Sequence, residues 1–313
     1  MGEGTRKDDA PPPALVGQLE RRGLGDYAGP DSVLERVSSY ERRGALVTVA
    51  GRSVQGEPIL SVEIGPAQAP VSLVVAGLHP MEWIGVESAL ACVEAWLEEP
   101  PAERRLVAVP MANPDGIRAV EANLRRGRRR FVRHNAHGVD LNRNFPAFWG
   151  SSPVARLLRR TFAPGRAPAS EPEVRAIIDR VARDPVDRVV SLHSFGGAVL
   201  YPYGAVRARA HDFRRLARWA ERVAESADTR RPYRAVQSSH WVAGFTARGM
   251  EIDYFYQHRG ALALLVECSR GGVWRRVPRP SHVVEPFAWF NPPERAATSN
   301  AIAGALMPFL RGD

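Results

Sequence analysis

The sequence is poor in cysteine and in lysine, and it contains no long apolar run. Two cysteines, Cys92 and Cys268, occur among 313 residues, which excludes a small scaffold held together by several disulfides. No apolar stretch approaches the roughly 18 residues of a transmembrane helix, and the N-terminal segment lacks the apolar core of a secretory signal. We therefore expect a cytoplasmic protein that does not associate with membranes.

Lys7 is the one lysine, so arginine supplies almost all of the positive charge. The formal net charge is +9, which on its own fits a protein that binds nucleic acid or another polyanion. The arginines are spread along the chain, however, with one dense cluster between residues 125 and 133. Because dispersed charge is typical of a solvated surface, we expect no nucleic-acid partner.

The rest of the composition is that of an ordinary globular protein, with 44% hydrophobic and 25% charged residues. Residues 1–30 begin with a charged stretch and a run of prolines, and we expect them to form a flexible N-terminal arm. No linker interrupts the chain between residues 31 and 313, which predicts a single domain.

Apolar runs and apolar stripes alternate along this domain. Short apolar runs predict buried strands, and apolar residues at every third or fourth position predict helices. The alternation favours a three-layer α/β/α fold with a central mixed, mostly parallel sheet. We expect strands at 45–50, 58–64, 71–77, 105–111, 187–192 and 261–266, and helices at 86–97, 174–181, 213–223 and 293–309.

A polar residue comes just after three of the expected strands. His79 follows the expected strand at 71–77, His193 follows the one at 187–192, and Glu267 follows the one at 261–266. Ligands of open α/β sheets bind beyond the carboxyl ends of the strands. We therefore expect these three side chains to converge on one site.

Glu82 adds a carboxylate three residues after His79, at the expected corner between strand and helix. Two histidines and one glutamate, here His79, His193 and Glu82, are a ligand set typical of catalytic zinc, which keeps a fourth position for water. Zinc lowers the pKa of that water to about 7 and polarises a carbonyl group. Glu267 is then free to accept the proton of the water. The sequence thus predicts one Zn²⁺ per chain.

Five short motifs follow one another along the chain. They are HPME at 79–82, NPDG at 113–116, GVDLNRNF at 138–145, LHS at 192–194 and LYPYG at 200–204. As a set, and in this order, they resemble the zinc metallocarboxypeptidase family, the carboxypeptidase A-like enzymes. The resemblance implies a peptidase that hydrolyses the C-terminal amide bond of peptides by means of a glutamate-activated, zinc-bound water.

The resemblance also implies roles for individual residues. It makes His79, Glu82 and His193 the zinc ligands and Glu267 the general base. Asp140 resembles the residue that orients the first zinc-binding histidine through a hydrogen bond.

Further residues resemble the substrate contacts of the family. Asn142 and Arg143 match the pair that binds the terminal carboxylate of the substrate, a group that a guanidinium fork binds in a bidentate manner. Ser194 resembles a position that contacts the substrate backbone. The family also uses an upstream arginine to stabilise the oxyanion, and here Arg133 is the first candidate and Arg130 the second.

Three positions depart from the family pattern. Met81 stands where the family often has an arginine that lines an outer subsite. Phe245 stands where the family has a mobile tyrosine, which assists substrate binding more than bond cleavage. Ile252 aligns with the position that contacts the substrate side chain, and its apolar character argues against a preference for basic C-terminal residues.

Alternative functions stay open at this point. The short segment at 135–145 is similar to bacterial members that cleave the γ-D-glutamyl–diaminopimelate bond of murein peptides. An N-acyl amino acid deacylase on the related fold would bind the same free carboxylate. A non-catalytic or polyanion-binding protein is the alternative from a different class. The sequence carries no sign of an oligomeric state, and residues 271–292 are expected to form a lid, an oligomer contact or a plain surface loop.

Overall fold

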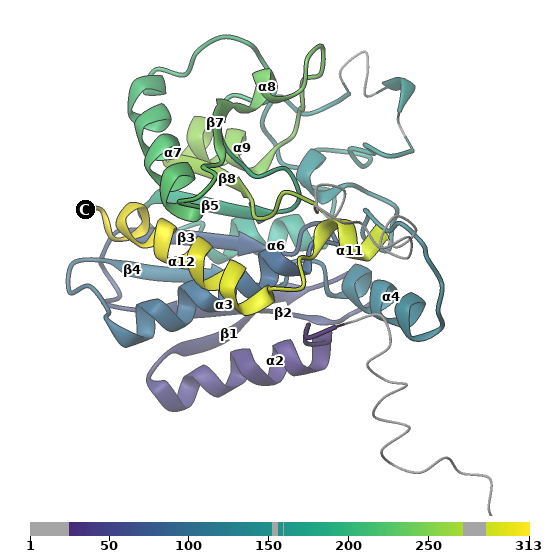
Figure 1. Ribbon diagram of the computed structural model, residues 1–313, viewed down its shortest axis with the longest axis horizontal. Helices are drawn as coiled ribbons and strands as arrows, with labels where there is room; N and C mark the ends of the chain where they lie inside the picture. Colours follow the sequence, from purple (N-terminus) through teal and green to yellow (C-terminus); the bar gives the residue numbers. More distant parts are fainter. Residues whose placement is uncertain (1–24, 152–155, 159, 272–285) are drawn as a thin grey trace, which may run out of the picture.

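A computed structural model describes residues 25–151, 156–158, 160–271 and 286–313 (Figure 1). Residues 1–24 of the expected arm lie outside the described residues, and so do residues 272–285 of the expected lid or contact segment. Tyr27 is buried, and its hydroxyl donates a hydrogen bond of 2.6 Å to the carbonyl of Pro292. The chain is therefore already packed against the rest of the protein at residue 27.

Eight strands of the described chain form one central sheet. They are β1 (Leu46–Arg52), β2 (Pro58–Ile64), β3 (Val71–Ala76), β4 (Arg105–Val109), β5 (Val186–His193), β6 (Ala198–Tyr201), β7 (Arg234–Gln237) and β8 (Leu262–Glu267). Their order across the sheet is β1-β2-β4-β3-β5-β8-β6-β7. The neighbours β4, β3, β5 and β8 run parallel, whereas β2 and β6 are antiparallel to β4 and β8. The four parallel strands therefore end at the same edge of the sheet.

Helices cover both faces of the sheet, as the sequence predicts (Figure 1). They are α2 (Pro30–Ser39), η1 (Tyr40–Arg43), α3 (Trp83–Glu98), α4 (Pro114–Arg125), η2 (Leu141–Arg143), α6 (Pro172–Arg180), α7 (Phe213–Ala227), α8 (Ser238–Trp241), α9 (Glu251–Arg259), α11 (Pro286–Phe290) and α12 (Arg295–Arg311). In Figure 1, α3 and α12 lie in front of the sheet and α6 and α9 lie behind it. The contacts agree, since α12 packs on α3, α3 on β3, β4 and β5, and α9 on β5 and β8.

The apolar patterns of the sequence follow from this layered packing. All residues of β3 and of β8 are buried, which explains why both strands are continuous apolar runs. The helix α3 is buried over most of its length, because α12 covers the side that would otherwise face solvent. Within the described residues, no helix combines the length and the apolar character needed to span a membrane.

The expected strands and helices are all present, with ends that differ by a few residues. The elements that were not predicted include β6, β7, α2, α4 and α9. The strands β6 and β7 have four residues each, too few to show a period. Residues Glu251–Tyr256 of α9 are all buried, so this helix has no polar face that would reveal it.

Candidate functional site

Three parallel strands bring the predicted site residues together. After β3 the chain forms β4 on one side of β3, and it later forms β5 on the other side. The carboxyl ends of β3 and β5 therefore lie at a topological switch point of the sheet. His79 follows β3, whereas His193 and Glu267 are the last residues of β5 and β8. All three side chains line the same cavity at this edge.

A tight corner turns the chain between β3 and α3. Gly77 has a φ of +70°, a conformation that glycine adopts without strain. The backbone N–H of Glu82 donates to the carbonyl of His79 at 3.2 Å and closes one turn. From a distant part of the chain, the side chain of Asn291 donates to the carbonyl of Met81 at 2.8 Å. The corner is therefore fixed both locally and by a long-range contact.

The first turn of α3 approaches the end of β5 closely. A Cβ on Gly85 would lie 2.8 Å from the carbonyl oxygen of Leu192, so only glycine fits there. This approach places Glu82 beside His193, and the backbone N–H of Ser194 donates to Oε2 of Glu82 at 3.1 Å.

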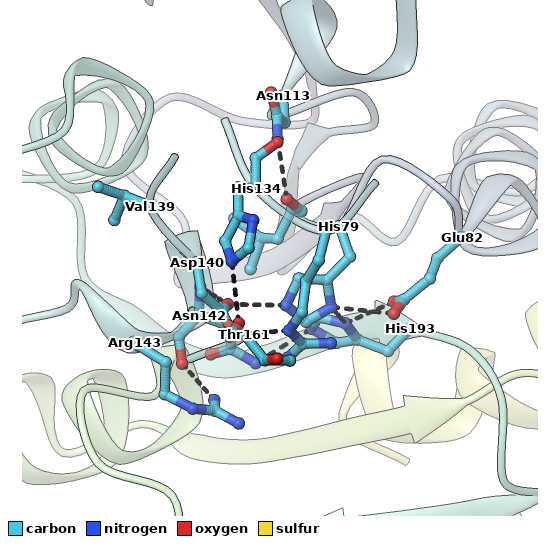
Figure 2. Close-up of polar contacts among 12 residues, drawn as sticks. His79, Glu82, Asn113, His134, Val139, Asp140, Asn142, Arg143, Thr161 and His193 are labelled. Atoms are coloured by element: carbon cyan, nitrogen blue, oxygen red, sulfur yellow. Dashed lines mark hydrogen bonds and ion pairs between the residues drawn. The ribbon is translucent and has the colours of Figure 1, made fainter. Parts of the chain in front are cut away.

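His79, Glu82 and His193 form a buried cluster in which one atom of each residue lies within 4.8 Å of the others (Figure 2). Nδ1 of His79 lies 2.9 Å from Oε1 of Glu82, and Nδ1 of His193 lies 2.8 Å from Oε2. The two Nδ1 atoms are 3.1 Å apart. Lone pairs from three side chains thus point into one small volume. This donor set fits Zn²⁺ and leaves one coordination position for water.

The charges of the cluster favour a cation. Burial by itself raises the pKa of Glu82, but His79 and His193 outweigh this effect and lower the pKa to about 2. Burial also lowers the pKa of His193. At neutral pH Glu82 is therefore a carboxylate and His193 a neutral imidazole, which are the forms that bind metal ions. Burial also lowers the pKa of His79, but Glu82 and Asp140 raise it overall, so His79 releases a proton when a metal ion binds.

Asp140 fixes the orientation of His79. Its Oδ1 lies 2.9 Å from Nε2 of His79 (Figure 2), and its Oδ2 accepts a hydrogen bond of 2.8 Å from Nε of Arg133. Burial raises the pKa of the Asp140 carboxyl, but Arg133 and His79 hold it well below its usual range. Ionised Asp140 accepts the Nε2 proton of His79, which leaves the Nδ1 lone pair for the cluster. His134, also drawn in Figure 2, lies 2.9 Å from the carbonyl of Thr161 instead.

Glu267 lies at the cavity with one oxygen unused. Its Oε2 is buried and has no hydrogen-bond partner among the described residues. Burial, and then the charge of Glu82, raise the pKa of Glu267 well above its ordinary value. A carboxylate with an unused oxygen at the cavity is suited to accept a proton from a water bound there.

Arg143 offers a buried cation at another wall of the cavity. Its Nη1 donates to the carbonyl of Asn142 at 2.5 Å (Figure 2), and its guanidinium lies 5.3 Å from the centre of the Phe162 ring. Its Nε has no hydrogen-bond partner among the described residues. Burial lowers the pKa of Arg143 to about 10. A buried guanidinium with an unused N–H group is suited to bind a carboxylate.

These groups surround one cavity of about 360 Å³. Its polar lining consists of His79, Glu82, Arg133, Asn142, Arg143, His193, Ser194, Ser238 and Glu267. The rest of its wall is apolar and consists of Leu158, Phe162, Phe195, Leu200, Trp241, Val242, Phe245, Ala247, Met250, Leu265 and Phe290. A mostly apolar pocket with a few convergent polar groups is the usual form of a small-ligand site.

The structure separates the two arginine candidates. Arg133 lines this cavity, whereas Arg130 lines a different one. Ser194 also lines it, and its hydroxyl has no hydrogen-bond partner in the described part of the chain. Phe245 lies in the wall, with its ring centre 5.1 Å from that of Phe162.

The structure does not place Ile252 at the cavity. Its side chain is buried in the core, because it is the second residue of α9 and this part of the helix packs inward. Met250, just before the helix, lines the cavity instead. Sequence reasoning missed this apolar wall, since its residues are scattered over several elements and share no local pattern.

Residues 32–296 match the sequence profile of a protein family described as zinc carboxypeptidase. Carboxypeptidase A2 of Mus musculus is 28% identical over 236 residues, which cover 68% of this chain and 56% of the mouse protein. The chain spans about half the length of the curated relatives that it matches.

Solved structures share the fold. Bovine thrombin-activatable fibrinolysis inhibitor, in complex with tick carboxypeptidase inhibitor, has a TM-score of 0.72 at 19% identity, over 93% of this chain and 99% of that chain. Murein-tripeptide amidase from Escherichia coli O157 has a TM-score of 0.53 at 22% identity, over 87% of this chain and 95% of that chain. At such low identities the likeness shows the fold alone.

Proposed function

The chain belongs to the zinc carboxypeptidase family, and we propose that it hydrolyses the C-terminal amide bond of peptides in the cavity at the ends of β3, β5 and β8. Zinc is the cofactor of this family, and the cluster of His79, Glu82 and His193 fits it. When bound, zinc supplies Lewis acidity to the scissile carbonyl and makes water a better nucleophile.

The residues of the chain carry the remaining steps. Glu267 takes the proton from the attacking water and returns it to the leaving amine, because it lines the cavity and its buried Oε2 has no hydrogen-bond partner among the described residues. Arg133 lines the same cavity and donates to the carbonyl oxygen as negative charge develops on it. Asp140 keeps Arg133 and His79 in place through its two oxygens.

The observation that carries the proposal is the buried guanidinium of Arg143 beside the metal-binding cluster. A peptide that ends in this cavity places its terminal carboxylate against Arg143, where a charge-assisted pair forms. Asn142 is held next to it, because its Oδ1 accepts from the backbone N–H of Glu251 at 2.9 Å. An internal peptide bond brings no carboxylate to this point, so cleavage is limited to the C-terminus.

The wall of the cavity favours an apolar C-terminal residue. Leu200, Met250 and Leu265 line it, and their side chains are apolar. Burying about 100 Å² of apolar side chain contributes about 2.5 kcal/mol. Diaminopimelate carries two charges on its side chain, for which these three residues offer no partner. We therefore favour ordinary peptides over murein peptides as substrates.

A product screen tests the proposal. Zinc-loaded protein is incubated with peptides that end in Leu, Phe, Lys or Asp, with murein tripeptide and with an N-acyl leucine, and the released amino acids are identified. We expect free Leu and Phe from the peptides, released at least tenfold faster than Lys or Asp. Release of diaminopimelate alone would assign the murein reaction instead, and cleavage of the acyl amino acid alone would assign a deacylase.

A further inference from the structure

A second buried carboxyl group lies behind the metal-binding cluster, on the side of His193. Ser191 and His193 are two positions apart on β5, so both side chains project to the same face. Oγ of Ser191 lies 3.1 Å from Nε2 of His193. The Ser191 hydroxyl in turn donates a hydrogen bond to Oε2 of Glu251, the first residue of α9. These contacts join His193, Ser191 and Glu251 in one continuous series of hydrogen bonds.

The direction of these hydrogen bonds follows from the roles of the atoms. Nδ1 of His193 points into the cluster and binds metal only when it is unprotonated, so the ring proton is on Nε2. Nδ2 of Asn142 lies 3.3 Å from Nε2 of His193. The Asn142 amide is oriented by the backbone N–H of Glu251, which donates to its Oδ1, so the Nδ2 group is a donor and cannot accept the Nε2 proton. Ser191 is therefore the acceptor for the Nε2 proton, and its own proton goes to Glu251.

Glu251 itself needs an explanation. Its side chain is fully buried, and its Oε1 has no hydrogen-bond partner among the described residues. Burial raises the pKa of Glu251 to about 8, although Ser191 and His79 lower it in part. A buried carboxyl group with an oxygen that lacks a hydrogen-bond partner lowers the stability of the fold. A divalent cation held by the nearby cluster supplies the positive charge that such a group lacks.

We propose that Glu251 is a positioning residue, which acts through Ser191 to fix the ring orientation and the Nε2–H tautomer of His193. Asp140 does the same directly for His79, at 2.9 Å. Each histidine of the cluster is then oriented by its own buried carboxyl group. Hydrogen bonds of this kind raise the basicity of a metal-binding imidazole and hold it in place. The inference rests on the proposed role of His193 as a zinc ligand.

Zinc affinity, measured by competition with a chelator, tests the inference without any assay of activity. Loss of such a partner typically weakens metal binding by about 10- to 100-fold. We expect Glu251→Gln to weaken zinc binding about tenfold and Ser191→Ala to do so by a similar factor. The double variant is expected to bind zinc no more weakly than Ser191→Ala alone, because without the Ser191 hydroxyl the side chain at position 251 has no hydrogen-bonded path to His193. Losses that multiply in the double variant would overturn the inference.

Two further variants separate positioning from simple destabilisation. Glu251→Met replaces the buried carboxyl by an apolar group of similar length, so we expect a metal-free protein at least as stable as the wild type that nevertheless binds zinc about tenfold more weakly. Glu173→Gln is the matched control: Glu173 is also fully buried, and it accepts from the backbone of Val54 at 3.1 Å, away from the cluster. This control is expected to keep wild-type zinc affinity.

The visible spectrum of the Co²⁺-substituted protein gives a second readout, since its absorption bands report the ligand geometry. We expect the bands of Glu251→Gln to shift from those of the wild type and those of Glu173→Gln to coincide with them. Wild-type affinity and an unshifted spectrum in both Glu251 variants would overturn the inference. His193→Ala separates a failure of the proposed zinc site from a failure of the role proposed for Glu251. If this variant retains zinc at full affinity, the proposed function has failed. If it loses zinc, the zinc site stands, and the Glu251 variants decide the role of Glu251.

Discussion

His193 and Glu267 are register partners at the carboxyl ends of the neighbouring parallel strands β5 and β8. Partners in such a pair project to the same face, and both side chains line the cavity. A shift of one residue in the register would turn one of them to the opposite face. The spacing between the proposed ligand and the proposed base is therefore set by the sheet itself and not by a loop.

The first prediction concerns this base. Glu267→Gln keeps the shape of the side chain but removes the group that accepts the proton. We expect the turnover of a C-terminal Leu or Phe peptide to fall by about 10²- to 10⁴-fold, while zinc content stays at one ion per chain. Steady-state kinetics and elemental analysis of the same preparation measure both quantities. Normal turnover in this variant would remove Glu267 from the mechanism.

The second prediction compares two arginines that the sequence left as alternatives. Arg133 lines the cavity, and Arg130 does not. We expect Arg133→Ala to lower kcat by about 10²- to 10³-fold, because a donor to the developing oxyanion is lost. Arg130→Ala serves as the control and is expected to retain wild-type kcat. Equal losses in the two variants would show that the effect comes from the overall positive charge of this segment.

The third prediction concerns recognition of the free carboxylate. Arg143→Met removes the buried guanidinium and keeps an unbranched side chain. A hydrogen bond to a charged group contributes about 1.5–3 kcal/mol, so kcat/KM for free peptides is expected to fall by about 10- to 100-fold. The same substrates with an amidated C-terminus are the control, because their poor cleavage should change little. A variant that still prefers the free acid would contradict the proposed clamp.

The fourth prediction concerns the removal of zinc. Three buried side chains each place one possible ligand atom within 4.8 Å of the others, so the folded chain offers a cation a site that the unfolded chain lacks. An ion that binds the folded state alone stabilises it by about 2.7 kcal/mol when its free concentration is 100 times Kd. We therefore expect the melting temperature to drop by about 5 °C on chelation and to recover when zinc is added back. His79→Ala should show no such response, and a similar response in that variant would argue for zinc binding elsewhere.

The fifth prediction is a pH dependence of stability caused by Asp253. This residue is fully buried, and its carboxylate accepts from the backbone N–H groups of Gly204 and Ala205, each at 2.9 Å. Burial raises its pKa from 3.8 to about 6, although these N–H groups and Arg143 lower it in part. Between these two values the folded state holds a proton that the unfolded state has lost, so stability falls as the pH rises.

Asp253→Asn removes this titration and isolates its effect. In the zinc-free protein, the unfolding free energy of the wild type relative to the variant is expected to fall by an amount on the order of 3 kcal/mol between pH 4 and pH 7. Urea unfolding at several pH values measures this difference. A difference that stays constant over the range, or rises with pH, would contradict the assignment.

Much of the fold followed from local patterns. The mainly apolar stretches of β3, β5 and β8 identified the centre of the sheet, and a polar residue after each stretch identified the edge at which the site lies. The four-residue strands β6 and β7 and the fully buried start of α9 carried no such pattern. The apolar wall of the cavity was missed for the same reason, since residues such as Leu200, Met250 and Leu265 belong to different elements.

By itself the sequence determined which chemical groups stand at the ends of which elements, because helix and strand periods and the spacing of His79 and Glu82 are local properties of the chain. Only the tertiary structure decided which of these groups face one another. It placed Nδ1 of His79 next to Nδ1 of His193, 114 positions away along the chain. It also set Met250 on the cavity wall and Glu251 behind Ser191. Such contacts depend on strand order, register and helix packing, which no local pattern of residues encodes.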